Sequence, residues 1–356
     1  MRYITPYIYV LLIVLIRPAD LSRAQEISLK NKKKSQVAYN QGIQSIKEDG
    51  YWVALEYLSA ALDYNPGFDL AYLTRGKVNL QLNNLDEAIQ DFTMAIQVNP
   101  ASGEAYFYRG YARLNDSAPK VVLDDLNAAV ANGYKNGFVY YYRGLYKLIH
   151  EDYTGAILDF TEAIGLERNY ARAYHDRGTA KRLLGDFQGA IYDYRQAVDI
   201  QPDFPQAFDN MGSVKTRLGD FQGAIDDYSV AIRLDTTFYL AYNNRGSARY
   251  QMGDYDGALE DFDKVIRLKP EFPEVYNNMG NTLAKLNRPV EALEMLDHAL
   301  ELDDHYGIAH MNRGFVKELT GDLDGACEDW NRAVKLGVEE ARQYLSECEK
   351  QTQNQE

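Results

Sequence analysis

The sequence predicts an all-helical protein built from nine repeats, each consisting of a helix, a turn and a second helix. Glycine recurs at intervals of 34 residues along most of the 356-residue chain. Twelve residues after each of these glycines stands Ala, or Val in one repeat, and sixteen residues after it stands a large apolar residue. A separation of four puts these last two residues on one helical face. A period of this length indicates an architecture of stacked helical repeats.

The repeat boundaries follow from the glycines. These are Gly42, Gly76, Gly110, Gly144, Gly178, Gly212, Gly246, Gly280 and Gly314. Starting each unit seven residues before its glycine gives repeats at 35–68, 69–102, 103–136, 137–170, 171–204, 205–238, 239–272, 273–306 and 307–340. Because the ends of such an array need polar caps, residues 341–350 are predicted to form a C-terminal capping helix and 351–356 a tail.

These columns resemble the tetratricopeptide repeat (TPR) family, which shares the glycine, alanine, aromatic, alanine and proline positions. The prolines that match the end of the second helix are Pro66, Pro100, Pro202 and Pro270. The resemblance covers residues 35–340 and implies a right-handed α-solenoid whose first helices line a concave groove. It also implies an interaction scaffold and not an enzyme, since the repeats leave no room for a catalytic domain.

The N-terminus has the features of an export signal over residues 1–24. Met1 and Arg2 precede an apolar stretch, residues 7–16, and Ser22 and Ala24 are small residues at cleavage spacing. We therefore expect cleavage after Ala24 and a bacterial envelope protein, periplasmic or secreted. The alternative is that the segment is retained as a membrane anchor.

The net negative charge of the chain argues against nucleic acid as a partner. The net charge is −14, and such a chain repels the phosphates that dominate nucleic-acid binding. The one basic run, Lys30 with 32–34, falls in a predicted linker over residues 25–34. It is interpreted as a solvated linker, with contact to a membrane surface as the alternative. The predicted partner is a protein or peptide, not nucleic acid, with membrane contact only if the signal segment is uncleaved.

Two further columns predict internal structure. Arginine precedes the glycine in six repeats, and Asp follows each of these arginines by sixteen residues, which predicts a structural ion pair between the two helices of a repeat. The predicted pairs are Arg75 with Asp91, Arg109 with Asp125, Arg143 with Asp159, Arg177 with Asp193, Arg245 with Asp261 and Arg313 with Asp329. Residues predicted to cap second helices at their N-termini are Asp186, Asp220, Asp254 and Asp322.

Candidate binding residues come from the positions around the glycine, which the resemblance places in the groove. The run Tyr140 to Tyr142 illustrates the assignment: Tyr140 is predicted to be core, Tyr141 to face the groove, and Tyr142 to share a column with four asparagines. The predicted peptide-binding residues are Leu73, Phe107, Tyr111, Tyr141, Leu145, Asn210, Asn244, Asn278 and Asn312. Ser247 and Asn281 lie in the column directly after the glycine, which is also expected to face the groove.

Asparagine both donates and accepts hydrogen bonds, which suits the backbone of an extended peptide. Aromatic and amide side chains also suit sugars, so recognition of a saccharide or cell-wall fragment is the alternative. No phosphate loop, nucleophile motif or metal-ligand spacing is present, and we expect no catalytic residue, cofactor or metal. Cys327 and Cys348 are predicted to form a disulfide, as expected for an exported protein, with two buried thiols as the alternative.

Overall fold

The computed structural model describes residues 28–114, 119–345 and 348. Over these residues it contains eighteen α-helices and no strand. The helices belong to two compact units, one ending at Lys135 and one beginning at Asn136. The predicted signal segment, residues 1–24, and the predicted tail, residues 351–356, lie outside the described residues.

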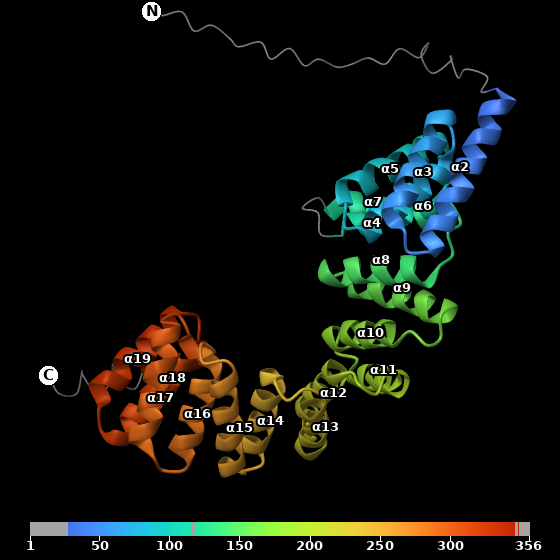
Figure 1. Cartoon of the computed structure of the whole chain (residues 1–356). Coiled ribbons are helices and arrows are strands. Elements are labelled where there is room, and N and C mark those ends of the chain that lie inside the picture. Colours follow the sequence, from blue (N-terminus) through green and yellow to red (C-terminus); the bar gives the residue numbers. More distant parts are fainter. Residues whose placement is uncertain (1–27, 115–118, 346–347, 349–356) are drawn as a thin grey trace, which may run out of the picture. The chain divides into compact units, whose positions relative to one another are not determined.

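The N-terminal unit consists of three helix pairs (Figure 1). They are α2 (Leu29–Lys47) with α3 (Tyr51–Tyr64), α4 (Asp69–Gln81) with α5 (Leu85–Val98), and α6 (Gly103–Ala112) with α7 (Pro119–Ala131). The hydroxyl of Ser28 accepts a hydrogen bond from the Asn31 amide and so caps α2. Helix α2 therefore includes Lys30 and residues 32–34, which differs from the basic linker predicted there.

The C-terminal unit consists of six pairs. They are α8 (Gly137–Ile149) with α9 (Tyr153–Leu166), α10 (Ala171–Leu183) with α11 (Phe187–Ile200), α12 (Pro205–Arg217) with α13 (Phe221–Leu234), α14 (Tyr239–Gln251) with α15 (Tyr255–Leu268), α16 (Pro273–Lys285) with α17 (Pro289–Leu302), and α18 (Gly307–Thr320) with α19 (Leu323–Lys335). From the second pair of the chain onward, each first helix begins at the residue that opens a predicted repeat. The all-α solenoid predicted from the period is confirmed.

The glycine column marks the place where the two helices of a pair approach each other. A methyl group on Gly212 would lie 2.8 Å from Cε1 of Tyr228, which is itself fully buried. The same approach occurs at Gly144, where the neighbour is the ring of Phe160. A side chain here would push the core aromatic residue out of place, so the close packing of each pair requires glycine.

Turns between paired helices are closed by the predicted aspartates. The carboxylate of Asp186 accepts a hydrogen bond from the Gly189 amide at 2.9 Å, and Asp220, Asp254 and Asp322 act in the same way. A methyl group on Gly189 would lie 2.1 Å from Oδ2 of Asp186. A side chain at this glycine would meet the capping carboxylate, so glycine in the first turn leaves room for the cap.

All six predicted Arg–Asp pairs are present, and each Asp is buried. Arg177 binds Asp193 through two parallel hydrogen bonds of 2.9 and 2.7 Å. The ammonium group of Lys181, three residues after the glycine, lies 2.8 Å from Oδ2 of the same carboxylate. Most of these carboxylates therefore lie between two cations.

Two repeats supply only one cation, and this changes the acidity of the carboxyl group. In the sixth repeat Met211 replaces the arginine, and Lys215 alone contacts Asp227. In the second repeat Arg75 is the one cation paired with Asp91 among the described residues, and the uncharged amide of Asn79 donates a further hydrogen bond. Burial raises the pKa of both carboxyl groups, and the single cation offsets this only in part.

Asp329 shows the opposite balance. Burial acts to raise its pKa, but hydrogen bonds from His310, Arg313 and Lys317 together lower the pKa below its ordinary value. The charge around the column thus differs from repeat to repeat, although the fold of each repeat is the same.

The C-terminal end of the array is closed by a covalent cap. A short 3₁₀ helix, Glu339–Ala341, is followed by helical residues 342–345 and 348. Tyr344 packs on Phe315 and Trp330, and Cys348 forms a disulfide with Cys327 in α19. The disulfide prediction agrees with the structure. No helix in the described part of the chain is long and apolar enough to cross a membrane.

Candidate peptide-binding surface

The tyrosine run in α8 is arranged differently from the prediction. Tyr140, expected in the core, is half-buried beneath the guanidinium group of Arg143, which lies 5.5 Å from its ring centre. Tyr141, expected to face the groove, is only 7% exposed. Its hydroxyl donates a hydrogen bond of 2.8 Å to Asp176, and its ring packs on Tyr170. Burial and the neighbouring Asp176 raise the pKa of Tyr141.

Other predicted apolar groove residues are also internal. Leu73 and Phe107 are each 5% exposed, so, as for Tyr141, little of the side chain is open to a ligand, and their predicted role in peptide binding stays a prediction. Tyr111 lies beside Phe107, and Leu145 packs against the core around Tyr141, both half-buried. For Leu73 and Tyr141 the reason is geometric: each lies three residues before the glycine and packs against residues of the next repeat in the same unit.

The asparagine column is engaged in hydrogen bonds between successive repeats. In each bond a residue two before the glycine pairs with the residue three before the glycine of the preceding repeat, 35 positions earlier. The pairs are Tyr39 with Thr74 (3.2 Å), Tyr141 with Asp176 (2.8 Å), His175 with Asn210 (2.9 Å), Asp209 with Asn244 (3.0 Å), Asn243 with Asn278 (3.0 Å) and Asn277 with Asn312 (2.7 Å). We call this set the inter-repeat ladder.

The inter-repeat ladder explains why these columns are polar. Each amide donates to its predecessor, and Asn312 is buried in doing so. Buried amides that are paired stabilise a specific register of the helices, whereas unpaired ones destabilise it. That Asn210, Asn244 and Asn312 also bind a peptide stays a prediction, but their first role is structural. A sequence signal existed: polar residues fill both columns together from the fifth repeat to the eighth.

One acid in the ladder has an unusual environment. Burial raises the pKa of Asp209 to about 6, and hydrogen bonding from Asn244 and the charge of Arg182 offset part of this rise. The Asp209 carboxyl group therefore takes up protons in a mildly acidic range.

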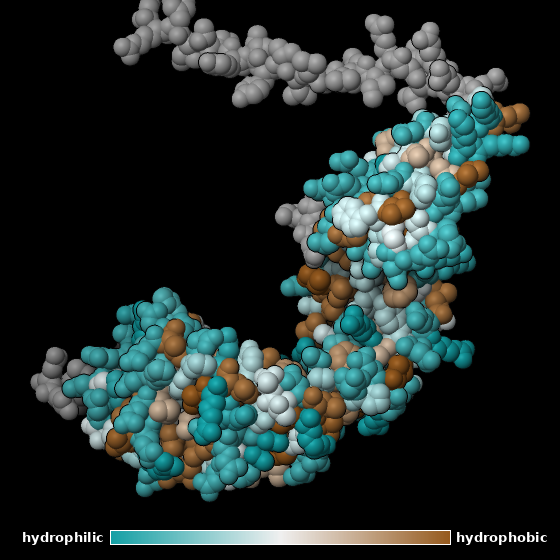
Figure 2. Space-filling view, in the orientation of Figure 1, coloured by the Kyte–Doolittle hydropathy of each residue, from teal (hydrophilic) through white to brown (hydrophobic). Residues whose placement is uncertain are grey.

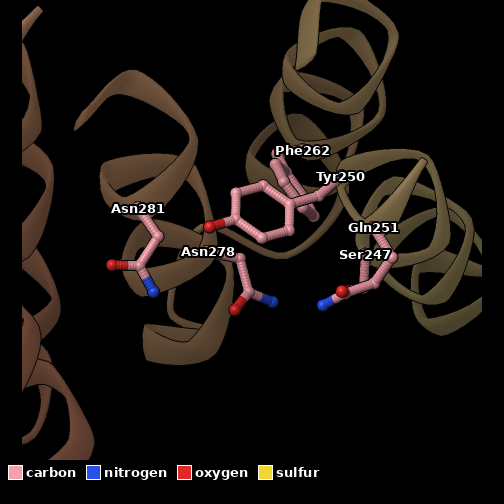
Figure 3. A pocket seen from close by; sticks show the side chains of 6 residues that line it. All are labelled: Ser247, Tyr250, Gln251, Phe262, Asn278 and Asn281. Atoms are coloured by element: carbon pink, nitrogen blue, oxygen red, sulfur yellow. The ribbon is translucent and has the colours of Figure 1, made fainter. Parts of the chain in front are cut away.

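An open pocket lies between α14 and α16 in the C-terminal unit. It has a volume of about 170 Å³ and is lined by Ser247, Tyr250, Gln251, Phe262, Asn278 and Asn281. Figure 3 shows the ring of Tyr250 at the centre, its hydroxyl directed toward Asn281, with the amides of Gln251 and Asn278 at the same opening. We call these six residues the amide pocket.

Several polar side chains of the amide pocket are available to form hydrogen bonds with a ligand. Among the described residues, the side chains of Tyr250, Gln251 and Asn281 make no hydrogen bond to another protein group, whereas Asn278 is held by Asn243. Burial raises the pKa of Tyr250, with a smaller contribution from Tyr255, so its hydroxyl stays protonated and able to donate. The pocket thus offers donors and acceptors above an apolar floor formed by Phe262.

The sequence predicted part of this pocket. Asn278 was among the predicted binding residues, and Ser247 and Asn281 belong to the column that follows the glycine. Tyr250 and Gln251, four and five residues after the glycine, were not predicted. One helical turn separates them from Ser247, and this spacing places them beside it.

Comparison with known proteins supports the repeat assignment. A TPR repeat model matches residues 178–219, 212–253 and 246–287. Two tetratricopeptide repeat models match residues 49–97 and 73–133, and residues 274–302. None of the curated protein sequences compared with the chain matches it.

Several solved structures share the fold at low sequence identity. A TPR protein from Parabacteroides merdae ATCC 43184 is 16% identical, with a TM-score of 0.57 over 69% of this chain and 98% of that one. The Cut9–Hcn1 complex of APC/C is 16% identical, with a TM-score of 0.55 over 85% of this chain and 63% of that one. YrrB, a TPR protein with an unusual peptide-binding site, is 20% identical, with a TM-score of 0.49 over 52% of this chain and 95% of that one. Identities this low show the fold alone. The tetratricopeptide repeat models, which match residues 49–133 and 178–302, place the chain in the tetratricopeptide repeat family.

Proposed function

We propose that the protein is a non-catalytic interaction scaffold of the bacterial cell envelope, which binds an extended segment of a partner protein at the amide pocket. TPR proteins generally act as interaction scaffolds, and this supports the class of function. The observation that carries the specific proposal is the group of unpaired polar side chains, Tyr250, Gln251 and Asn281, at one opening.

The chemistry of the pocket fits a peptide backbone. An amide side chain can donate to a backbone carbonyl and accept from a backbone N–H at the same time. Gln251 and Asn281 stand on neighbouring first helices, α14 and α16, and so offer two such contacts along one ligand. The ring of Tyr250, which is only partly buried, provides an apolar surface for one side chain of the bound segment, above the fully buried Phe262. These features lie together around one pocket, as Figure 3 illustrates.

Two features support export. The predicted signal segment at residues 1–24 precedes the repeats. The disulfide between Cys327 and Cys348 is of the kind that persists in oxidising compartments. Expression in a bacterial host, followed by cell fractionation and intact-mass measurement, tests this part. We expect the protein in the envelope fraction, with the mass of a chain that begins at Gln25. A chain that stays in the cytoplasm at full mass would contradict it.

Photo-cross-linking tests the binding site. A photoreactive amino acid is placed at Gln251 in the pocket or, as a matched control in the same unit, at the exposed Tyr192 of α11. We expect protein adducts from position 251 that are absent from position 192, and their loss when Asn281→Ala is added. Mass spectrometry of the adduct then identifies the bound segment.

The other outcomes separate the alternatives. Adducts that contain cell-wall glycan, and that disappear when muropeptide is added, would replace the peptide by a saccharide ligand. Identical adducts from positions 251 and 192 would show that the amide pocket is not a specific site.

A further inference from the structure

The N-terminal repeat exposes a position that every other repeat buries. Val37 is the third residue of its repeat and is 58% exposed. The same position in the other eight repeats is fully buried, at 0% exposure: Ala71, Ala105, Val139, Ala173, Ala207, Ala241, Val275 and Ala309. In the other repeats this position is therefore covered by neighbouring residues, whereas at Val37 it is exposed to solvent.

Internal repeats show what normally covers this position. Ala309 packs in one cluster with Ala299 and Leu300 of the preceding second helix, α17. Ala241 packs with Ala231 and Ile232 of α13 in the same way. The complementary surface is thus a helix that carries Ala followed by Leu or Ile. Within the described residues no helix precedes α2, so Val37 has no such neighbour.

The open position belongs to a groove between α2 and α3. The groove has a volume of about 420 Å³ and is lined by Lys33, Lys34, Val37, Ala38, Gln41, Tyr57, Ala60 and Tyr64. We call it the N-terminal groove. Leu29 at the start of α2 and Trp52 and Val53 at the start of α3 are also exposed. Figure 2 shows apolar patches interrupting the hydrophilic surface along α2.

Charge at this groove is opposite to that of the whole chain. Lys30 and residues 32–34 cluster beside it, and the ammonium group of Lys34 lies 5.1 Å from the ring centre of Tyr64. The whole chain has a net charge of −14. Two copies that met through this face would bring their lysine clusters together, which is unfavourable. An acidic helix is complementary in both charge and shape.

We propose that the N-terminal groove binds one helix of a partner protein, with an adjacent Ala–Leu or Ala–Ile pair on its apolar face and acidic residues beside it. The helix takes the place that a preceding second helix occupies in the internal repeats. This site lies in the N-terminal unit, and the inference does not depend on the function proposed for the amide pocket.

A peptide copied from the chain itself provides the probe. The sequence of α17, residues 289–302, carries Ala299 and Leu300 together with the acids Glu291, Glu294, Asp297 and Glu301. A hydrocarbon staple on its outer face holds the helix, because a free peptide of this length is mostly unfolded. Binding of the labelled peptide to the full chain, and to the chain from Gln25 onward, is followed by fluorescence anisotropy.

Matched variants locate the site. Val37→Arg places a charge in the groove at an exposed position, so the fold is retained, and we expect at least about tenfold weaker binding. Lys33→Glu with Lys34→Glu should weaken binding about as strongly, and rising salt should weaken binding to the wild type. Val121→Arg, at an exposed apolar position of α7 outside the groove, should bind like the wild type.

Each contrary result would overturn the inference. These results are no binding up to about 0.5 mM peptide, or binding that Val37→Arg leaves unchanged. Binding only after residues 1–24 are removed would show that the chain's own N-terminus occupies the groove. A dimer in sedimentation analysis that Val37→Arg dissociates would assign the groove to a second copy. Cosedimentation with anionic phospholipid vesicles, lost in the lysine variant and unaffected by the peptide, would assign it to a membrane surface.

Discussion

Replacing Asp193 by Asn is expected to destabilise the fifth repeat strongly. The Asp193 carboxylate is fully buried and accepts hydrogen bonds from Arg177 at 2.7 and 2.9 Å. It also contacts Lys181 at 2.8 Å. An Asn side chain keeps one oxygen acceptor but carries no charge, so both cations lose their counter-ion. Removing one partner from a buried ionic cluster costs about 3–5 kcal/mol. Because Arg177 and Lys181 reach the surface, we expect a loss of about 3 kcal/mol.

The same substitution in the sixth repeat is the matched control. Asp227 stands in the same column, but its only cation is Lys215, since Met211 replaces the arginine. Burial raises the pKa of Asp227, which means that the folded protein holds this charge less favourably than water does. Loss of the charge therefore relieves this burial cost, which offsets the loss of the ion pair with Lys215. For Asp227→Asn we expect a change of about 1 kcal/mol or less.

Hydrogen exchange measured by mass spectrometry at neutral pH resolves the two effects. Repeat arrays unfold locally, so a single unfolding midpoint would mix the contributions of all repeats. Asp193→Asn should speed the exchange of amides in α10 and α11, whereas Asp227→Asn should change α12 and α13 little. Equal effects of the two substitutions, or no effect of the first, would refute the assignment of the double-cation cluster as a structural interaction.

Three further predictions concern other parts of the chain. Asp209→Asn should stabilise the protein above pH 6. Because burial raises the pKa of Asp209 to about 6, its contribution to stability is fully present below its ordinary pKa and is lost as the pH rises through 6. Asn carries no charge at any of these pH values, so the variant does not lose this stability. The gain should be about 1–2 kcal/mol at pH 7.5 and absent at pH 4, measured by hydrogen exchange of the amides in α12. Cys348→Ser should lower the stability of the C-terminal repeat by about 3 kcal/mol, because the loop to Cys327 is no longer closed. We expect faster hydrogen exchange of the amides in α19. A reductant should have no further effect on the variant. Gly212→Ala should cost about 1–3 kcal/mol, because the new methyl group meets Tyr228; a thermal midpoint at or above that of the wild type would contradict this packing.

The architecture was readable from the sequence because it depends on local spacing. Helix periodicity and the approach of paired helices act within one repeat, and they require the same residue types every time. The glycine at position 212, the aspartate cap at 186 and the pair of Arg177 with Asp193 were all predicted for this reason, and all are found. The predictions were less accurate where the exposure of a side chain depends on the neighbouring repeat.

The sequence could not separate an open groove residue from one that packs on the next repeat. Tyr141 and Asn312 were predicted to bind a ligand because their side chains have suitable chemistry. In the structure, both form hydrogen bonds to another repeat. Which of them is covered depends on the angle and distance between successive first helices.

By itself the sequence determined the helical class, the 34-residue period, the six Arg–Asp pairs and the four aspartate caps, and it favoured the disulfide that the structure contains. Only the tertiary structure decided that the asparagine column forms the inter-repeat ladder, that Tyr250 and Gln251 complete an open pocket, and that Val37 stays uncovered. Contacts within a repeat follow from spacing along one helix pair, whereas contacts between repeats follow from how the pairs stack, which no single repeat encodes.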